Sequence, residues 1–266
     1  MLDAKVLSEY LDFAVQAAEA AGRIALEYFP GPHRPCPEIA TKADDSPVTI
    51  ADRQAEEKLR ELIRREFPGH GIFGEEFGRE KPDSEFVWII DPIDGTKSFV
   101  RGVPLYGVLI ALEYRKECVV GVIHHPSLGE TVRAAKGLGC FWNDRRVTVS
   151  SIDDPKKAMF LCTNGASFHK KNPELLSALL DRVTFWRGWS DCYGYTLVAT
   201  GRAEVMLDPA MAPWDCAALK PILEEAGGTF TNWEGEATIH GTDAMGTNGR
   251  MYDFMMDLMR RHRRAL

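Results

Sequence analysis

The 266-residue sequence lacks the cysteine pairs and the long apolar runs that mark several classes of protein. Its six cysteines are scattered without a C-x-x-C pair, which argues against a zinc ribbon or a compact disulfide framework and suits a reducing cytoplasm. No run of about 18 uncharged apolar residues occurs, so we expect no membrane span. Acidic residues interrupt any apolar run near the N-terminus, and we therefore expect no signal peptide and a cytoplasmic protein.

The sequence also lacks an excess of basic residues, because its formal net charge is -7. A negative chain disfavours generic nucleic-acid binding through a basic surface. It can still bind an anion if metal ions invert the local field. Hydrophobic residues make up 45% of the chain, which is enough for a core in one large domain or two small ones.

Residues 1–150 are predicted to form an α+β half. Apolar residues at three- and four-residue steps predict a helix over 3–29, and a second helix is expected from Thr49, a good N-cap, to Glu66. A short strand at 72–74 leads into two glutamates. The pattern of residues 86–150 predicts an antiparallel or mixed sheet with strands at 86–91, 105–113, 118–124, 130–135 and 147–150.

Residues 151–266 are predicted to form an α/β half, because strands and helices alternate along it. Strands are expected at 159–162, 183–187 and 203–207. Helices are expected at 173–181, 191–200 and 214–226. The predicted fold class is therefore α/β (α+β), with the two halves divided near residue 150.

The segment Asp91-Pro92-Ile93-Asp94-Gly95-Thr96 directly follows an apolar strand. Carboxylates at a strand end can bind divalent metal ions, and backbone N–H groups beside a glycine can receive phosphate oxygens. Hydrolysis of a phosphate monoester needs neutralised phosphate charge, a nucleophilic water and a stabilised leaving alkoxide, and two metal ions can supply all three. The motif therefore predicts a metal-dependent phosphatase.

Further carboxylates come from separate segments. Glu75 and Glu76 end an earlier strand, and Asp215 opens the helix expected at 214–226. Asp215 would suit a helix N-terminus even without a metal, and the Asp-Pro and Asp-Gly pairs also form ordinary acidic turns. The apolar strand before the motif and the Gly-Glu-Glu element before that strand favour the metal site. A non-catalytic binding protein on the same fold would be expected to have lost some of these carboxylates.

These elements together resemble the inositol monophosphatase family. They are Gly74-Glu75-Glu76, the segment from Trp88 to Phe99, and Trp214-Asp215 with Gly227-Gly228, and they stand in the family's order and spacing. Ser46-Pro47-Val48-Thr49 with Asp52 is similar to the family's upstream element. The resemblance covers roughly residues 10–250. It implies a layered α-β-α-β-α sugar-phosphatase fold, often a homodimer.

The resemblance also implies the roles of individual residues. Two or three Mg²⁺ ions, with Mn²⁺ as an alternative, would be held by Glu75, Asp91, the Ile93 carbonyl, Asp94 and Asp215. Phosphate would bind to the backbone of Gly95 and Thr96. Thr96, Asp52 and Glu75 would be catalytic, with Thr96 orienting the attacking water, and Glu76 would support a metal ligand. Asp52 could instead serve only to stabilise the first turn of its helix.

The substrate is expected to be chosen by the second half of the chain. The segment 187–195 resembles the histidinol-phosphate phosphatase branch, particularly in Asp191-Cys192-Tyr193-Gly194-Tyr195, and the segment 97–104 is also similar to that branch. The resemblance implies L-histidinol phosphate as substrate, a role in histidine biosynthesis, and substrate contacts from Arg187, Asp191 and Asp208. An inositol 1-phosphate or broad sugar-phosphate phosphatase is the alternative.

The charge of Asp191 agrees with this substrate. Histidinol phosphate carries an ammonium group and a titratable imidazole, whereas inositol carries only hydroxyls. A charge-assisted hydrogen bond to such a cation contributes about 1.5–3 kcal/mol, which is roughly a ten- to hundredfold preference. Asp191 could also be an N-cap of the helix that follows it. The pair His124-His125 is interpreted as structural, because adjacent strand residues point to opposite faces.

Overall fold

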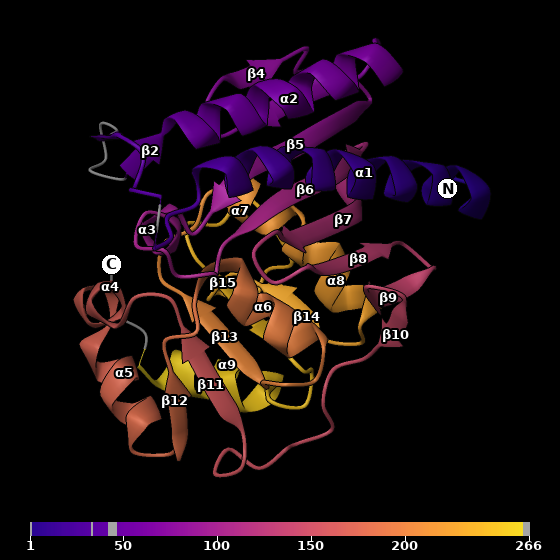
Figure 1. Cartoon of the computed structure of the whole chain (residues 1–266). Coiled ribbons are helices and arrows are strands. Elements are labelled where there is room, and N and C mark those ends of the chain that lie inside the picture. Colours follow the sequence, from indigo (N-terminus) through magenta and orange to yellow (C-terminus); the bar gives the residue numbers. More distant parts are fainter. Residues whose placement is uncertain (1, 33, 42–46, 263–266) are drawn as a thin grey trace.

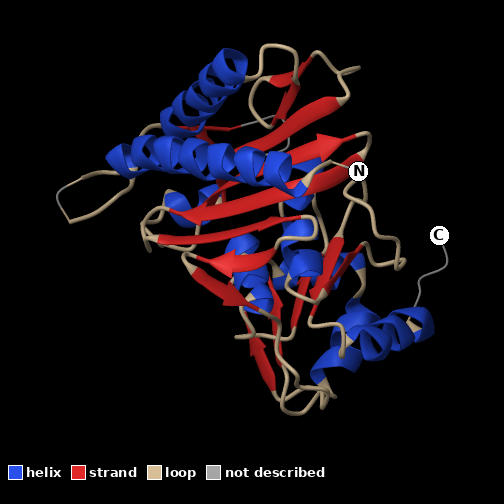
Figure 2. Cartoon of the chain, turned by 90° about the vertical axis from the view of Figure 1, so that its right-hand side faces the viewer, coloured by secondary structure: helices blue, strands red, loops and turns tan. Residues whose placement is uncertain are grey.

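The computed structural model describes residues 2–32, 34–41 and 47–262, so Ser46 of the predicted upstream element lies outside the described residues. The described residues form alternating layers of helices and strands (Figure 1). The view in Figure 2 shows the strands of two larger sheets between helical layers. This arrangement confirms the predicted α/β class and the layered α-β-α-β-α order. None of the described helices is both long enough and apolar enough to cross a membrane.

The larger sheet belongs to the first half of the chain. Its strand order is β10-β9-β8-β7-β6-β5-β3-β4, and only β3 and β5 pair in parallel among these neighbours. The strands are β3 (Gly71–Gly74), β4 (Gly78–Glu80), β5 (Phe86–Asp94), β6 (Gly107–Tyr114), β7 (Glu117–His125), β8 (Glu130–Ala135), β9 (Gly139–Trp142) and β10 (Arg145–Val147). Because β3 and β5 run in parallel, their carboxyl ends meet at one edge, where Gly74 pairs with Ile90.

Helices cover both faces of this sheet. α1 (Ala4–Tyr28) and α2 (Ile50–Glu66) bury alanine and leucine stripes on one face, as their helical periodicity predicts. α7 (Pro213–Ala217) and α8 (Leu219–Glu225) lie on the other face. A two-stranded sheet of β1 (Ile39–Thr41) and β2 (Pro47–Thr49) leads into α2, and the short α3 (Thr96–Phe99) follows β5.

The smaller sheet belongs to the second half and has the order β12-β11-β13-β15-β14. α6 (Asp191–Ala199) lies between the two sheets, and α5 (Pro173–Leu180) and α9 (Tyr252–Arg261) pack on the far face (Figure 1). α4 (Gly165–Lys171) precedes α5. The strands are β11 (Met159–Cys162), β12 (Phe185–Arg187), β13 (Val205–Asp208), β14 (Thr229–Thr231) and β15 (Ala244–Thr247). β11 and β13 are parallel, so their carboxyl ends also share one edge.

Several predicted elements need correction. The strand expected at 147–150 is wrong, because the chain forms the hairpin β9–β10 instead and leaves 148–150 outside any strand. The helix expected at 214–226 is two helices that separate at Ala218. Pro221 explains this break, because it has no N–H to donate to the carbonyl of Ala217 and its ring would clash there. Short strands β1, β2, β4, β14 and β15 and helix α4 were not predicted.

Candidate active site

Three carboxylates from the two halves of the chain converge at one point. Asp91 and Asp94 lie at the carboxyl end of β5, and Asp215 lies in the first turn of α7. One oxygen of each lies within 4.8 Å of one oxygen of each of the others. The pairing of β5 with β6 is irregular between Asp91 and Asp94, which brings both side chains toward α7 although they are three residues apart.

Backbone N–H groups fix each of the three side chains. The N–H of Ile93 donates to Asp91 Oδ1 at 3.0 Å, and the N–H of Ala212 donates to Asp215 Oδ2 at 2.7 Å. The N–H of Cys192 donates to Asp94 Oδ2 at 2.6 Å. Asp94 therefore satisfies the first turn of α6 and ties β5 of one sheet to the helix between the sheets. The cluster is thus rigidly held before any ion binds.

The cluster concentrates negative charge in a buried place. Burial raises the pKa of Asp91 and Asp94 well above the usual aspartate range, and neighbouring carboxylates raise both further. Burial is also the main reason that the pKa of Asp215 rises to about 7, with Glu75 adding to the effect. An all-oxygen donor set with excess negative charge fits a hard divalent cation such as Mg²⁺. A bound cation would return these carboxylates to their charged form.

Glu75 joins the cluster because β3 and β5 are parallel. It directly follows β3, and its N–H donates to the Ile90 carbonyl at 3.3 Å, one residue before Asp91. Its charge is among the causes that raise the pKa of Asp91 and of Asp215. Glu76 lies in the same turn, and its charge raises the pKa of Asp52. The structure therefore brings both predicted glutamates to the site, with Glu76 on the side of Asp52.

Gly95 and Thr96 start α3 beside the cluster. Gly95 is left-handed, with φ +85°, and a Cβ there would lie 3.1 Å from the Leu105 carbonyl and 3.2 Å from Asp191 Oδ2. Only glycine fits this position without strain. The first-turn N–H groups of a helix have no carbonyl partner within that helix, and they can donate to an anion. The backbone at Gly95 and Thr96 is therefore compatible with the predicted phosphate contacts.

Thr96 links the metal cluster to α2. Its Oγ1 lies 3.0 Å from the Ile93 carbonyl and 3.4 Å from Asp52 Oδ1. Asp52 Oδ2 accepts hydrogen bonds from the N–H of Thr49 at 2.8 Å and from its hydroxyl at 2.7 Å. Asp52 thus stabilises the start of α2 and also reaches Thr96, so its catalytic role stays a prediction that the contact with Thr96 permits. Burial, partly offset by the Thr49 hydrogen bonds, raises the pKa of Asp52 to about 6.

A cavity of about 470 Å³ opens over these residues. Its lining includes Glu75, Asp94, Gly95, Thr96 and Asp215 from the metal side. The lining also includes polar residues of the second half: Thr163 and Asn164 after β11, Ser167 of α4, Asp191 of α6 and Asp208 of β13. A groove of about 880 Å³ between α1 and α2 is larger, but none of the clustered carboxylates lines it. The chemistry therefore belongs to the smaller cavity.

Asp208 ends β13 and is buried. Its Oδ1 accepts a hydrogen bond from the N–H of Thr163 at 3.2 Å, and its carboxyl group also interacts with the buried hydroxyl of Tyr195. Burial is the largest cause that raises the pKa of Asp208 to about 7, and the contacts with Thr163 and Tyr195 lower it in part. Asp208 therefore adds a buried carboxyl group to the lining of the cavity.

Asp191 adopts a left-handed backbone conformation with φ +54°, which is uncommon for a residue other than glycine. Its N–H donates to Thr163 Oγ1 at 2.9 Å, and its Oδ2 accepts from Ser190 Oγ at 2.9 Å. Ser190 occupies the N-cap position of α6, so Asp191 is not the cap. Burial raises the pKa of Asp191, while Ser190, Lys97 and Ser98 lower it in part.

Arg187 is not brought to this cavity. It lies on the edge strand β12, is exposed, and its Nη1 donates to the neighbouring Trp186 carbonyl at 2.7 Å. It is not among the residues that line the cavity. The resemblance of the segment 187–195 implied the contact, but the loop between β12 and α6 separates Arg187 from Asp191.

Sequence reasoning missed Lys97, Thr163, Asn164 and Ser167 as cavity residues. Lys97 follows the motif directly, and its charge acts on Asp191. Thr163 and Asn164 follow β11, and the parallel pairing of β11 with β13 places them beside Asp208. The rule that ligands bind at the carboxyl ends of parallel strands was the signal that could have found them.

The interpretation of His124 and His125 as structural residues is confirmed. His125 is fully buried, with Nδ1 2.9 Å from the Tyr106 carbonyl and Nε2 2.9 Å from Thr196 Oγ1. The Nδ1 of His124 lies 2.8 Å from Thr131 Oγ1. Burial lowers the pKa of both rings to about 4, so they stay neutral at physiological pH.

Comparison with known proteins matches residues 6–262 to the inositol monophosphatase family. A histidinol-phosphatase from Chlorobaculum parvum is 44% identical over 251 residues, covering 90% of this chain and 94% of that protein. A histidinol-phosphatase from Mycobacterium tuberculosis is 39% identical, covering 81% and 85%. The structure of an IMPase from Thermotoga maritima superposes with a TM-score of 0.86 at 29% identity, covering 95% of this chain and 97% of that one.

Proposed function

The chain belongs to the inositol monophosphatase family and is a phosphoric monoester hydrolase, and we propose that it hydrolyses L-histidinol phosphate with Mg²⁺ as cofactor. The observation that carries this proposal is that two sets of acidic residues meet at one cavity. Asp91, Asp94 and Asp215 form the first set, and Asp191 and Asp208 form the second. The first suits a metal-bound phosphate, and the second suits a cation at the other end of the same molecule.

In this mechanism Glu75, Asp91, the Ile93 carbonyl, Asp94 and Asp215 would hold two or three Mg²⁺ ions, for which Mn²⁺ could substitute. The bound ions would supply neutralisation of the phosphate charge, acidity to the attacking water and stabilisation of the leaving alkoxide. The N–H groups beside Gly95 and Thr96 receive the phosphate oxygens. Thr96 Oγ1, held between the Ile93 carbonyl and Asp52, orients the attacking water.

Proton transfer is the role of Asp52 in this mechanism. Its pKa of about 6 is close to the operating range of a general base near neutral pH. Thr96 lies between Asp52 and the Ile93 carbonyl, so a proton from the attacking water can pass through the threonine hydroxyl to Asp52 Oδ1. Glu76 supports this arrangement from the same turn as Glu75.

Substrate choice depends on what Asp191 and Asp208 offer. Asp208 lines the cavity, and its buried carboxylate would attract an ammonium or imidazolium group of the substrate. Asp191 presents a carboxylate from a residue with a left-handed backbone. The positive charge of Lys97 acts on this carboxylate, so a cationic substrate would interact with it in addition to Lys97. Both relatives named above as histidinol-phosphatases agree with a cationic substrate. Inositol offers only hydroxyl groups to these carboxylates.

The experiment compares histidinol phosphate with inositol 1-phosphate in the wild type and in Asp191→Asn. Asparagine keeps the size and tolerates the left-handed backbone, but it removes the charge. We expect kcat/KM to fall about ten- to hundredfold for histidinol phosphate and less than threefold for inositol 1-phosphate. Arg187→Ala, outside the cavity, should change neither. A wild type with higher kcat/KM for inositol 1-phosphate would show that the alternative substrate is correct.

We also propose that the protein acts in the cytoplasm as a homodimer, in a histidine biosynthesis pathway, with most metal ligands in residues 1–150 and Asp215 in residues 151–266. The scattered cysteines support the location. Light scattering at micromolar concentration tests the dimer, since a mass near twice 29.7 kDa is expected. A mass near 29.7 kDa would contradict it.

A further inference from the structure

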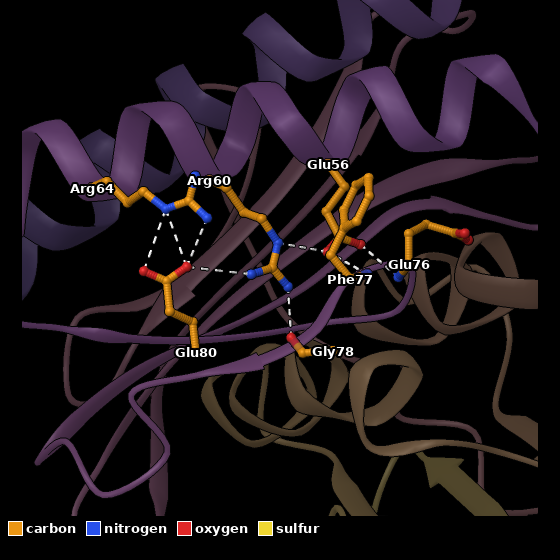
Figure 3. A network of polar contacts seen from close by, with 7 residues as sticks. All are labelled: Glu56, Arg60, Arg64, Glu76, Phe77, Gly78 and Glu80. Carbon is orange, nitrogen blue, oxygen red and sulfur yellow. Dashed lines mark hydrogen bonds and ion pairs between the residues drawn. The ribbon is translucent and has the colours of Figure 1, made fainter.

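We propose that Glu56 and Arg60, neither of which binds the metal, form a positioning pair that holds Glu75 at the metal cluster. This inference rests on the proposed function. Both residues lie on α2, four positions apart, at the height of the turn that joins β3 to β4 (Figure 3). That turn consists of Glu75, Glu76 and Phe77.

Glu56 holds the second and third residues of the turn through their backbone N–H groups. Its Oε2 accepts from the N–H of Glu76 at 2.8 Å, and its Oε1 accepts from the N–H of Phe77 at 3.2 Å (Figure 3). The side chain of Glu56 is fully buried. A buried carboxylate is stable only when hydrogen bonds and a counter-charge satisfy it, so the buried Glu56 needs both of these N–H donors and a positive partner.

Arg60 supplies the counter-charge and holds the other side of the turn. Its Nε donates to Glu56 Oε1 at 2.8 Å, and its Nη2 donates to the Gly78 carbonyl at 2.6 Å. Its guanidinium is buried, with 5% of the side chain exposed. Glu56 therefore accepts hydrogen bonds from two N–H groups of the turn, and Arg60 donates one to the carbonyl of Gly78, the residue that follows the turn.

Gly74 shows that the backbone is shaped for this contact. A Cβ at Gly74 would lie 2.1 Å from Glu56 Oε1, which no side chain could tolerate without displacing the carboxylate. Glycine immediately before Glu75 therefore lets Glu56 reach under the turn. On its other side the turn is tied to β5 by the hydrogen bond from the Glu75 N–H to the Ile90 carbonyl.

The consequence is that the position of Glu75 depends on Glu56. Two elements determine the turn: β5 through Ile90, and α2 through Glu56 and Arg60. Residues that orient metal ligands typically change metal affinity by about 10- to 100-fold when they are altered. The pair should therefore affect Mg²⁺ binding more than it affects the contacts of the substrate with Asp191 and Asp208.

The test compares Glu56→Gln with Arg64→Gln. Glutamine has a single acceptor oxygen and an NH₂ group that cannot accept the N–H of the turn. Arg64 lies one turn further along α2 and pairs with the partly exposed Glu80, so it is a matched control in the same network (Figure 3). Mg²⁺ affinity is measured by calorimetric titration of the folded protein, and kcat and KM are measured at limiting and saturating Mg²⁺.

We expect Glu56→Gln to weaken Mg²⁺ binding at least tenfold, with KM for substrate changed less than threefold at saturating Mg²⁺. Arg64→Gln should stay within twofold of the wild type. Unchanged Mg²⁺ affinity in a folded Glu56→Gln protein would overturn the inference while leaving the phosphatase function intact. A wild type that neither binds Mg²⁺ or Mn²⁺ nor hydrolyses phosphate esters would instead overturn the function itself, and the inference with it.

A second variant keeps the inference testable if Glu56→Gln does not fold. Arg60→Lys keeps the positive charge beside Glu56 but cannot form the same forked contacts to Glu56 and to the Gly78 carbonyl. We expect a smaller loss of Mg²⁺ affinity, about three- to tenfold, with a normal circular dichroism spectrum. A folded Arg60→Lys protein with the Mg²⁺ affinity of the wild type would contradict the role assigned to the pair.

Discussion

The buried carboxylates make a counter-intuitive prediction about stability: replacing a metal ligand should stabilise the metal-free protein. Asp215 has an ordinary pKa of 3.8 that rises to about 7 in the fold, mainly because it is buried. A raised aspartate pKa means that the folded state binds the proton more tightly than the unfolded state. Stability from this group is therefore complete below about pH 4 and is lost as the pH rises to about 7.

The magnitude follows from the pKa of Asp215. Each tenfold change in proton affinity corresponds to about 1.4 kcal/mol. The rise to about 7 therefore represents at most about 4 kcal/mol, and we expect about 2–4 kcal/mol because Asp91, Asp94 and Glu75 share the same protons. Asp215→Asn removes this charge and keeps an oxygen that can accept from the Ala212 N–H. In EDTA at pH 8 its melting temperature should exceed that of the wild type by roughly 5–15 °C.

The assay is thermal unfolding of both proteins at pH 5 and pH 8, with EDTA or with saturating Mg²⁺. The advantage of the variant should shrink toward pH 5, and Mg²⁺ should stabilise the wild type but not the variant. Asp83→Asn, which changes an exposed carboxylate, is the control and should shift neither curve. An Asp215→Asn protein that is no more stable than the wild type in EDTA at pH 8 would refute the reasoning.

Three further substitutions test individual parts of the site. Asp94→Asn should leave a folded protein, checked by circular dichroism, without Mg²⁺-dependent phosphate release; near-native turnover would contradict its role as a ligand. Gly95→Ala should lower kcat/KM at least tenfold, and the melting temperature slightly, because φ is +85° and the new Cβ would lie 3.1 Å from the Leu105 carbonyl. Thr96→Ala should lower kcat about 10²- to 10⁴-fold while Thr96→Ser keeps most activity, and equal losses would show that the hydroxyl is not used.

The clustered carboxylates of the candidate metal site could be predicted from sequence because local patterns specify them. An apolar strand followed by Asp91 and Asp94 places both carboxylates at a strand end, and Thr49 as an N-cap places Asp52 in the first turn of α2. Glu75 needed one more step, the parallel pairing of β3 with β5. The position of Asp215 depended only on the start of α7, so the break that Pro221 causes further along did not affect it.

Residues whose roles depend on tertiary contacts could not be predicted in the same way. Glu56 and Arg60 are four residues apart on a helix, a spacing that usually indicates an exposed ion pair. They are buried only because the turn after β3 folds over them. Arg187 shows the opposite error, since it is close to Asp191 in sequence but lies on the edge strand β12. In both cases the position in the sequence does not predict whether the side chain is buried or exposed, because the packing of other elements determines it.

Substrate choice is the least predictable property for the same reason. Asp191 lies on α6 and Asp208 on β13, and Thr163 contacts both residues. The hydroxyl of Thr163 accepts a hydrogen bond from the N–H of Asp191, and the N–H of Thr163 donates one to the side chain of Asp208. Thr163 therefore fixes the spacing between the two charges that a cationic substrate would meet. A substrate without a cationic group does not depend on the spacing between these two carboxylates, whereas a substrate with an ammonium group and an adjacent ring does. The distance between two carboxylates, more than the presence of either one, should thus separate enzymes of this fold by substrate.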